Sequence, residues 1–187
     1  MKAIGAGLIA ALALAGAAAA ADPVTAKEAK KALFAPVKGE VVIMPEANLP
    51  EDQAKTLQLV GATQVYYGAI AMSPEDGLLT EATVVAANYH NVAAASVAAL
   101  ADCNAKKKGK SDCVVAAIIQ PKGWKDRGFQ LSSDATAAVK SELKKSMVMA
   151  ISQATGAWAV GADDAAAVAA CAAKNEKATD CAVAVTN

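Results

Sequence analysis

One histidine and two serines are the residues best suited to nucleophilic catalysis. His90 is the only histidine in the chain of 187 residues. A histidine can remove the proton from a serine hydroxyl and so activate it, provided that a third group holds the imidazole in the correct tautomer. Ser73 and Ser96 are the candidate nucleophiles, and acidic side chains between residues 75 and 81 could hold the ring. One possible function of the protein is therefore a small periplasmic hydrolase that uses His90 with one of these serines.

Two features of the sequence favour structural roles for the same residues. No nucleophile-elbow motif surrounds Ser73 or Ser96. Ser73 also has a counterpart, Ser152, in a similar stretch of the second half that contains no histidine. We therefore interpret Ser73 as a turn residue and His90 as an exposed side chain at the end of a strand, and we assign no catalytic residue.

The first 21 residues carry the pattern of a secretory signal peptide. Lys2 precedes an uninterrupted apolar run, and Ala19 and Ala21 satisfy the small-x-small cleavage rule ahead of Asp22. An uncleaved membrane anchor is the alternative, because about 20 apolar residues can cross a bilayer. Alanine and glycine dominate the run, however, and they partition only weakly into lipid. We expect cleavage after residue 21, a periplasmic or secreted protein, and no stable membrane span after cleavage.

The four cysteines occupy two similar stretches, CNAKKKGKSDC and CAAKNEKATDC. An even number of cysteines in an exported chain favours disulfides. Of the three possible connectivities, the similarity of the two stretches predicts Cys103–Cys113 and Cys171–Cys181. A zinc site is the alternative, but zinc ligands usually stand in pairs with about two to four residues between them. Nine residues separate the cysteines in each pair, so we expect no metal.

The composition of the expected mature chain argues against a nucleic-acid partner. Without residues 1–21 the chain has 166 residues, with 17 basic and 18 acidic side chains. A nucleic-acid-binding domain normally carries an excess of positive charge. The chain also has only two Phe, three Tyr and two Trp to stack on bases.

The similarity of the two halves predicts the elements that position these residues. Each half contains an apolar strand ending in Ala-x-Ser and a turn that ends in glycine. Residues 87–91 and 157–161 then read as returning strands. Alanine-rich helices follow, capped by Asn91 in the first half and by Asp163 or Asp164 in the second. Each helix ends near its first cysteine, and the second cysteine begins a further strand.

The predicted fold is a single α+β domain over residues 22–187. Residues 65–121 and 146–187 form two strand–strand–helix–strand repeats, each closed by a disulfide, and we expect their strands to pair in one shared sheet. Residues 122–145 supply a linking loop and helix. Residues 22–64 supply an N-terminal helix–strand–helix segment.

Aromatic side chains would cluster where the two repeats meet. Tyr67, Tyr89 and Trp158, together with His90, are candidates for a binding surface lining a small apolar groove. The alternative, which we favour, is that the aromatic residues fill the core between the repeats. An additional stretch in the first half, LLTEATVVA, lengthens its hairpin, and any function-specific shape is expected there.

Several segments together resemble a family of small exported bacterial proteins of unassigned function, over nearly all of the mature chain. They are YYGAIAMSPEDGL, ANYHNVAAASVAALADC, DCVVAAIIQPKGW and the C-terminal TGAWAVG, CAAK and DCAVAV. Each half is similar to a domain of unknown function of secreted bacterial proteins. The resemblance implies no catalytic residues.

Proteins that resemble this chain are sometimes labelled 5-aminolevulinate synthase. That activity would require pyridoxal phosphate, held as a Schiff base on a lysine within a large scaffold. The mature chain is short and has no recognisable Gly-rich phosphate-binding loop, and the acyl-CoA and glycine substrates are cytosolic. We therefore expect no cofactor. The leading prediction is an exported, non-enzymatic protein that binds an envelope or secreted protein partner, or another envelope component.

Overall fold

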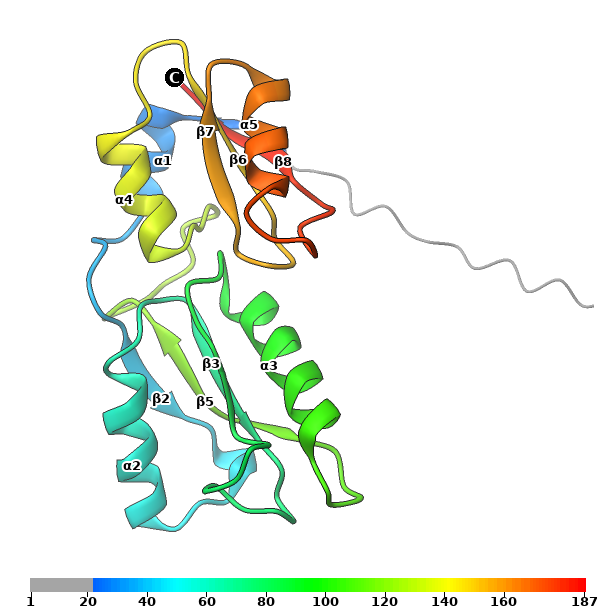
Figure 1. The fold of residues 1–187 in the computed structure, drawn as a ribbon. Coiled ribbons are helices and arrows are strands. Elements are labelled where there is room, and N and C mark those ends of the chain that lie inside the picture. The colour runs from blue at the N-terminus through cyan, green and yellow to red at the C-terminus, as the bar shows by residue number, and fades with distance from the viewer. Residues whose placement is uncertain (1–21) are drawn as a thin grey trace, which may run out of the picture.

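The computed structural model describes residues 22–187, so the predicted signal peptide lies outside the described residues. The chain forms two stacked units, each with its own four-stranded sheet (Figure 1). The strands are β1 (Val24–Thr25), β2 (Glu40–Ile43), β3 (Gly68–Met72), β4 (Val84–Ala86), β5 (Val114–Gln120), β6 (Val148–Ile151), β7 (Trp158–Gly161) and β8 (Ala182–Thr186). The helices are α1 (Ala26–Ala32), the 3-10 turn η1 (Pro45–Ala47), α2 (Glu51–Gly61), α3 (Val92–Lys106), α4 (Ser133–Ser141) and α5 (Asp164–Ala172).

The first unit, residues 38–121, is an antiparallel sheet between two helices. Its strand order is β2-β5-β3-β4, with α2 on one face and α3 on the other (Figure 1). The strand β3 serves both faces because its side chains alternate. Ile70 and Met72 join the cluster that contains Leu57 of α2, whereas Ala69 and Ala71 join the cluster of α3.

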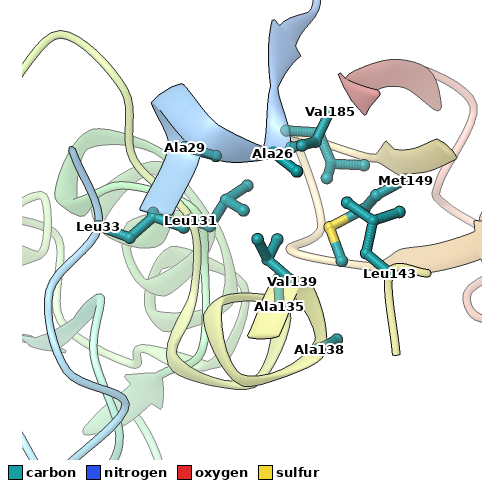
Figure 2. Close-up of a cluster of buried hydrophobic side chains, with 11 residues drawn as sticks. Ala26, Ala29, Leu33, Leu131, Ala135, Ala138, Val139, Leu143, Met149 and Val185 are labelled. Carbon is teal, nitrogen blue, oxygen red and sulfur yellow. The ribbon is translucent and has the colours of Figure 1, made fainter. Parts of the chain in front are cut away.

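The second unit, residues 22–34 and 129–187, has the strand order β1-β8-β6-β7. The helices α1 and α4 cover one face of its sheet, and α5 covers the other (Figure 1). Figure 2 shows the larger core of this unit, where Leu131 and Val139 lie between Ala29 of α1 and Met149 of β6. Burial of such side chains contributes roughly 1.5–3 kcal/mol each, so this cluster holds the N-terminal helix on the sheet.

Alanine lets the α5 helix lie very close to its sheet. Ala150 and Ala159 of the sheet face Ala167 of the helix, and all three are buried. A Cβ atom added at Gly161 would lie 2.3 Å from the backbone nitrogen of Ala167. The alanine-rich faces noted in the sequence are therefore packing surfaces.

The predicted cysteine pairs are confirmed. Cys103 is joined to Cys113, and Cys171 is joined to Cys181. Each bridge ties the C-terminal part of a helix to the residue before the following strand. In a chain-entropy description, a loop of this length contributes about 3 kcal/mol to stability.

Carboxylates fasten each disulfide loop to the hairpin turn beside it. In the first unit, Asp76 accepts hydrogen bonds from the amides of residues 108 and 109, and Glu75 accepts them from the amides of residues 110 and 111. In the second unit the direction is reversed, because Asp180 of the loop accepts from the amide of Ala154 in the turn. These acidic residues therefore have structural partners.

The α+β class is confirmed, but three expectations about its arrangement are wrong. The strands do not share one sheet, because β5 and β8 each lie inside a separate four-stranded sheet. The returning strand of the first unit is Val84–Ala86, within the additional stretch, and residues 87–91 lie after it. The N-terminal segment is divided: α1 packs in the second unit and α2 packs in the first.

Candidate binding cleft

A cleft of about 920 Å³ lies between the two units. We call it the inter-unit cleft. One wall comes from the first unit, through the start of α3 and through Ile118 and Gln120 of β5. The opposite wall comes from the second unit, through Ala182–Ala184 of β8 together with Val24 and Ile151.

The loop that connects the units forms a third wall of the inter-unit cleft. It contributes Trp124 and Phe129, and Trp124 has 37% of its surface exposed. Most of the lining side chains are therefore aliphatic or aromatic. Ligand sites of proteins are typically concave, mostly apolar and roughly 300–1,000 Å³ in volume, so the inter-unit cleft has the character of a binding site.

Two carboxylates provide the formal charge of the cleft. Among the described residues that line it are Asp22 and Asp180, and no lysine or arginine. Burial opposes ionisation of Asp180, but hydrogen bonds from Ser152 and from the amide of Ala154 outweigh it and lower the pKa of this carboxyl. Cleavage after residue 21, which the sequence predicts, would add the α-ammonium group of Asp22 to this lining, so the carboxylates alone do not fix the charge of an occupant.

His90 lies at the base of the inter-unit cleft and joins the two units. Its side chain has 0% exposed surface. The amide of Ser132, the N-cap of α4, donates to Nδ1 at 3.1 Å, and Nε2 donates to the carbonyl of Ala157 at 3.2 Å. Both ring nitrogens are occupied, which fixes the neutral tautomer with its proton on Nε2.

The electrostatics of this position favour the neutral imidazole. Burial lowers the pKa of His90 to about 4, although the carbonyl of Ala157 and the carboxylate of Asp180 favour the charged form. The free energy needed to remove the charged ring from water exceeds the stabilisation of that ring by these two groups. At neutral pH, His90 is an uncharged hydrogen-bonding bridge.

Further hydrogen bonds beside His90 hold the units together. Asn88 exchanges two with Asp134: its side-chain nitrogen donates to the carboxylate at 2.8 Å, and its Oδ1 accepts from the amide at 3.2 Å. Asn91 accepts from the amide of Ala94, as the predicted cap, and donates to Gln153 at 3.0 Å. The residues that begin α3 therefore bind the second unit and set the width of the cleft.

The structure does not assemble the candidate catalytic residues. Among residues 22–187, no hydrogen bond joins His90 to Ser73 or Ser96. Ser73 is buried and accepts from the amide of Asp76, which confirms its role in the turn. The expectation that His90 is exposed is wrong, because the contact between the units covers it completely.

The candidate binding-surface residues are not brought together as one surface. Tyr67 is only 1% exposed, and Tyr89 packs against the core beneath α3. Trp158 lines a separate hollow of about 300 Å³ near Gly156. Of the four candidates only His90 contributes to the inter-unit cleft. Tyr89 packs on a core of the first unit and Trp158 on a core of the second, so these two do not fill a core between the repeats as we favoured. The additional stretch of residues 78–86 does not line the inter-unit cleft either.

Two further findings concern the described part of the chain. Within residues 22–187, no three or more His, Cys, Asp or Glu side chains gather closely enough to hold a metal ion. Over the same residues, no helix combines the length and apolar character needed to span a membrane. The two disulfides indicate folding in an oxidising compartment.

Comparison with known proteins gives no family assignment: no protein-family model, curated protein or solved structure matches the chain. The residues that matter most in the inter-unit cleft, Ala182–Ala184, Ile118 and Phe129, carry no recognisable motif in the sequence.

Proposed function

We propose that the protein is an exported, non-enzymatic binding protein, and that the inter-unit cleft is the site at which it takes a partner protein or another envelope component. The observation that supports this proposal is the mostly apolar cleft of about 920 Å³ at the junction of the units. The two disulfides and the signal-like N-terminus favour a periplasmic or secreted location. The matching order of the three strands within each repeat, β5-β3-β4 and β8-β6-β7, also favours descent of the units from one repeated segment.

A binding role agrees better with the geometry than catalysis does. A general base needs a nitrogen that is free to accept the substrate's proton, whereas both nitrogens of His90 are engaged within the protein. The cleft instead offers apolar walls held in fixed positions by the hydrogen bonds between the units. Preformed apolar walls are what a binding site uses to limit the entropy lost on association.

Site-specific photocrosslinking in the native envelope tests the proposal. A benzophenone amino acid would replace Ala93, an exposed residue of α3 that lines the cleft, in the full-length protein. The matched control places the same group at Ala101, an exposed position on the same helix that does not line the cleft. Mass spectrometry would then identify the crosslinked molecules.

We expect a reproducible adduct from position 93 and none of the same species from position 101. The purified partner should then bind the unmodified protein, and Ala93→Trp should weaken this binding because it places a bulky side chain at the wall of the cleft. Identical adducts from both positions would contradict the assignment of the cleft as the binding site. The absence of any adduct from a correctly processed and oxidised protein would contradict the binding role itself.

A further inference from the structure

The two units are joined without a shared hydrophobic core. Each buried hydrophobic cluster of residues 22–187 lies within one unit. Over the same residues, no helix or strand of one unit makes more than slight contact with a helix or strand of the other. Two short segments, residues 35–37 and 122–128, connect the units covalently. Units joined in this way commonly move relative to each other.

Three consecutive amides at the N-terminus of α4 hold the first unit. The amides of residues 132, 133 and 134 donate in turn to Nδ1 of His90, to the carbonyl of Tyr66 and to Oδ1 of Asn88, at 3.1, 2.9 and 3.2 Å. The first amides of a helix have no partner within the helix, so the first unit supplies acceptors that these amides need. We call these three hydrogen bonds the α4 contact.

His90 is the acceptor of the α4 contact that can gain a proton. Its Nε2 already carries one, because this nitrogen donates to the carbonyl of Ala157. A second proton must therefore bind at Nδ1, and both ring nitrogens are then donors. The new N–H would point at the N–H of Ser132, which now donates to Nδ1. The protonated ring is therefore incompatible with the α4 contact.

The surroundings of the ring decide which state of the units a proton favours. Asp180, on the loop before β8, stabilises the charged ring, but burial opposes it more strongly. Asp134 lies two residues from Ser132, and its carboxylate accepts from the side chain of Asn88. Among the described residues, no lysine or arginine acts on the ring. When the units separate, water surrounds the ring and removes the penalty of burial, so acid favours separation.

We propose that His90 is an acid-sensitive switch: a proton taken from water at Nδ1 breaks the hydrogen bond from Ser132, releases α4 from the first unit, and lets the units separate about residues 35–37 and 122–128. Each unit keeps its own core and its own disulfide, so both remain folded. Separation widens the inter-unit cleft, which His90 and Asn91 line, and acid thereby changes the shape of the cleft. The switch does not depend on the proposed function, because its test needs no partner.

Proton linkage gives the size of the effect. The pKa of His90 is about 4 in the closed state, whereas the exposed ring of the separated state has the ordinary value of 6.5. The separated state therefore binds more protons between these values. From pH 7 to pH 5, the ratio of separated to closed molecules should rise about twentyfold.

Amide hydrogen exchange of the oxidised, ¹⁵N-labelled protein measures this separation. The reporters are the amides of residues 132–134, and the references are amides of the central strands β3 and β6, which lie inside the units. Protection is calculated against the exchange of an unstructured peptide at each pH. The matched variant is His90→Gln, which keeps a donor and an acceptor but does not titrate.

We expect protection at residues 132–134 to fall about twentyfold from pH 7 to pH 5 in the wild type, and to change by no more than about twofold in His90→Gln. An equal fall in both proteins would overturn the role of His90. At pH 7 the same amides should exchange faster than those of β3 and β6 and should respond little to low concentrations of urea, because local separation exposes little surface. Exchange as slow and as urea-dependent as in the central strands would show that the units part only on global unfolding, and would overturn the switch.

The ¹⁵N shifts of the imidazole test the switch in the wild type alone. At pH 7 they should show the neutral ring with its proton on Nε2. A proton on Nδ1 at pH 7 would overturn the switch, because the ring would then not accept from Ser132.

Discussion

His90 makes the stability of this protein depend on pH in a range where few other groups titrate. It is the only histidine, and its pKa is lowered from 6.5 to about 4, chiefly by burial. In the unfolded chain the imidazole takes up a proton near pH 6.5, whereas in the fold it does so only near pH 4. The unfolded state therefore binds more protons between these values, and stability must fall as the pH falls through this range.

The size of the effect follows from the same two values. At about 1.4 kcal/mol per pH unit, the complete loss between pH 6.5 and 4 is about 3 kcal/mol. About 2 kcal/mol of this should be lost between pH 7 and pH 5. Carboxylates with lowered pKa values, such as those of Glu75 and Asp180, add their losses mainly at lower pH, as their unfolded forms become protonated.

Urea unfolding at pH 7, 6 and 5, followed by tryptophan fluorescence, measures this dependence. His90→Gln is the control, because glutamine keeps a donor and an acceptor but does not titrate. The variant should be about 1–3 kcal/mol less stable at pH 7, since two buried hydrogen bonds are disturbed, and its stability should change little down to pH 5. A flat profile for the wild type, or an equal slope in His90→Gln, would refute the role given to His90.

Three other changes test how the units are built. The double variant Cys171→Ala/Cys181→Ala should lose about 3 kcal/mol of unfolding free energy in urea, and an unchanged free energy would contradict the role of this bridge. Glu75→Gln should speed amide exchange at residues 110 and 111, whose amides donate to Glu75, and should leave exchange at Ala154 unchanged. Equal exchange rates at residues 110 and 111 in wild type and variant would show that the carboxylate does not hold the loop. Gly77→Ala should lower the free energy of unfolding by about 1 kcal/mol, because of the positive φ at this position alone. Gly156→Ala should lower it further, because the added Cβ would also lie 2.7 Å from the carbonyl oxygen of Asn88. Equal losses of unfolding free energy in urea would contradict the close contact between the units.

Local patterns in the sequence predicted the parts of the fold that depend on local physics. The two cysteine pairs follow from spacing and similarity, and both are present. Asn91 and Asp163 cap their helices, as expected from the short polar side chains that precede alanine-rich segments. The Ser73 turn was also predicted, because its counterpart at Ser152 has a similar sequence without a histidine.

The association of the units could not be predicted in the same way. Apolar alternation identifies strands but does not say whether two sets of strands join one sheet or form two, and the expected shared sheet was wrong. The burial of His90 depends on Ser132 and Ala157, which lie 42 and 67 residues away in the sequence. The cleft arises from the same long-range contacts, and its wall at Ala182–Ala184 consists of small apolar residues without a distinctive pattern.

The affinity of the crosslinked partner for two variants of α3 tests the central claim most directly. Ala93→Trp places a bulky side chain at the wall of the inter-unit cleft, and Ala101→Trp places the same side chain on the same helix outside it. Both substitutions carry a similar cost in helix propensity, roughly 0.5 kcal/mol, so a difference between them reports on the cleft. The account predicts at least tenfold weaker binding by Ala93→Trp and a change within about twofold for Ala101→Trp. Equal affinity of the two variants would contradict the assignment of the inter-unit cleft as the binding site.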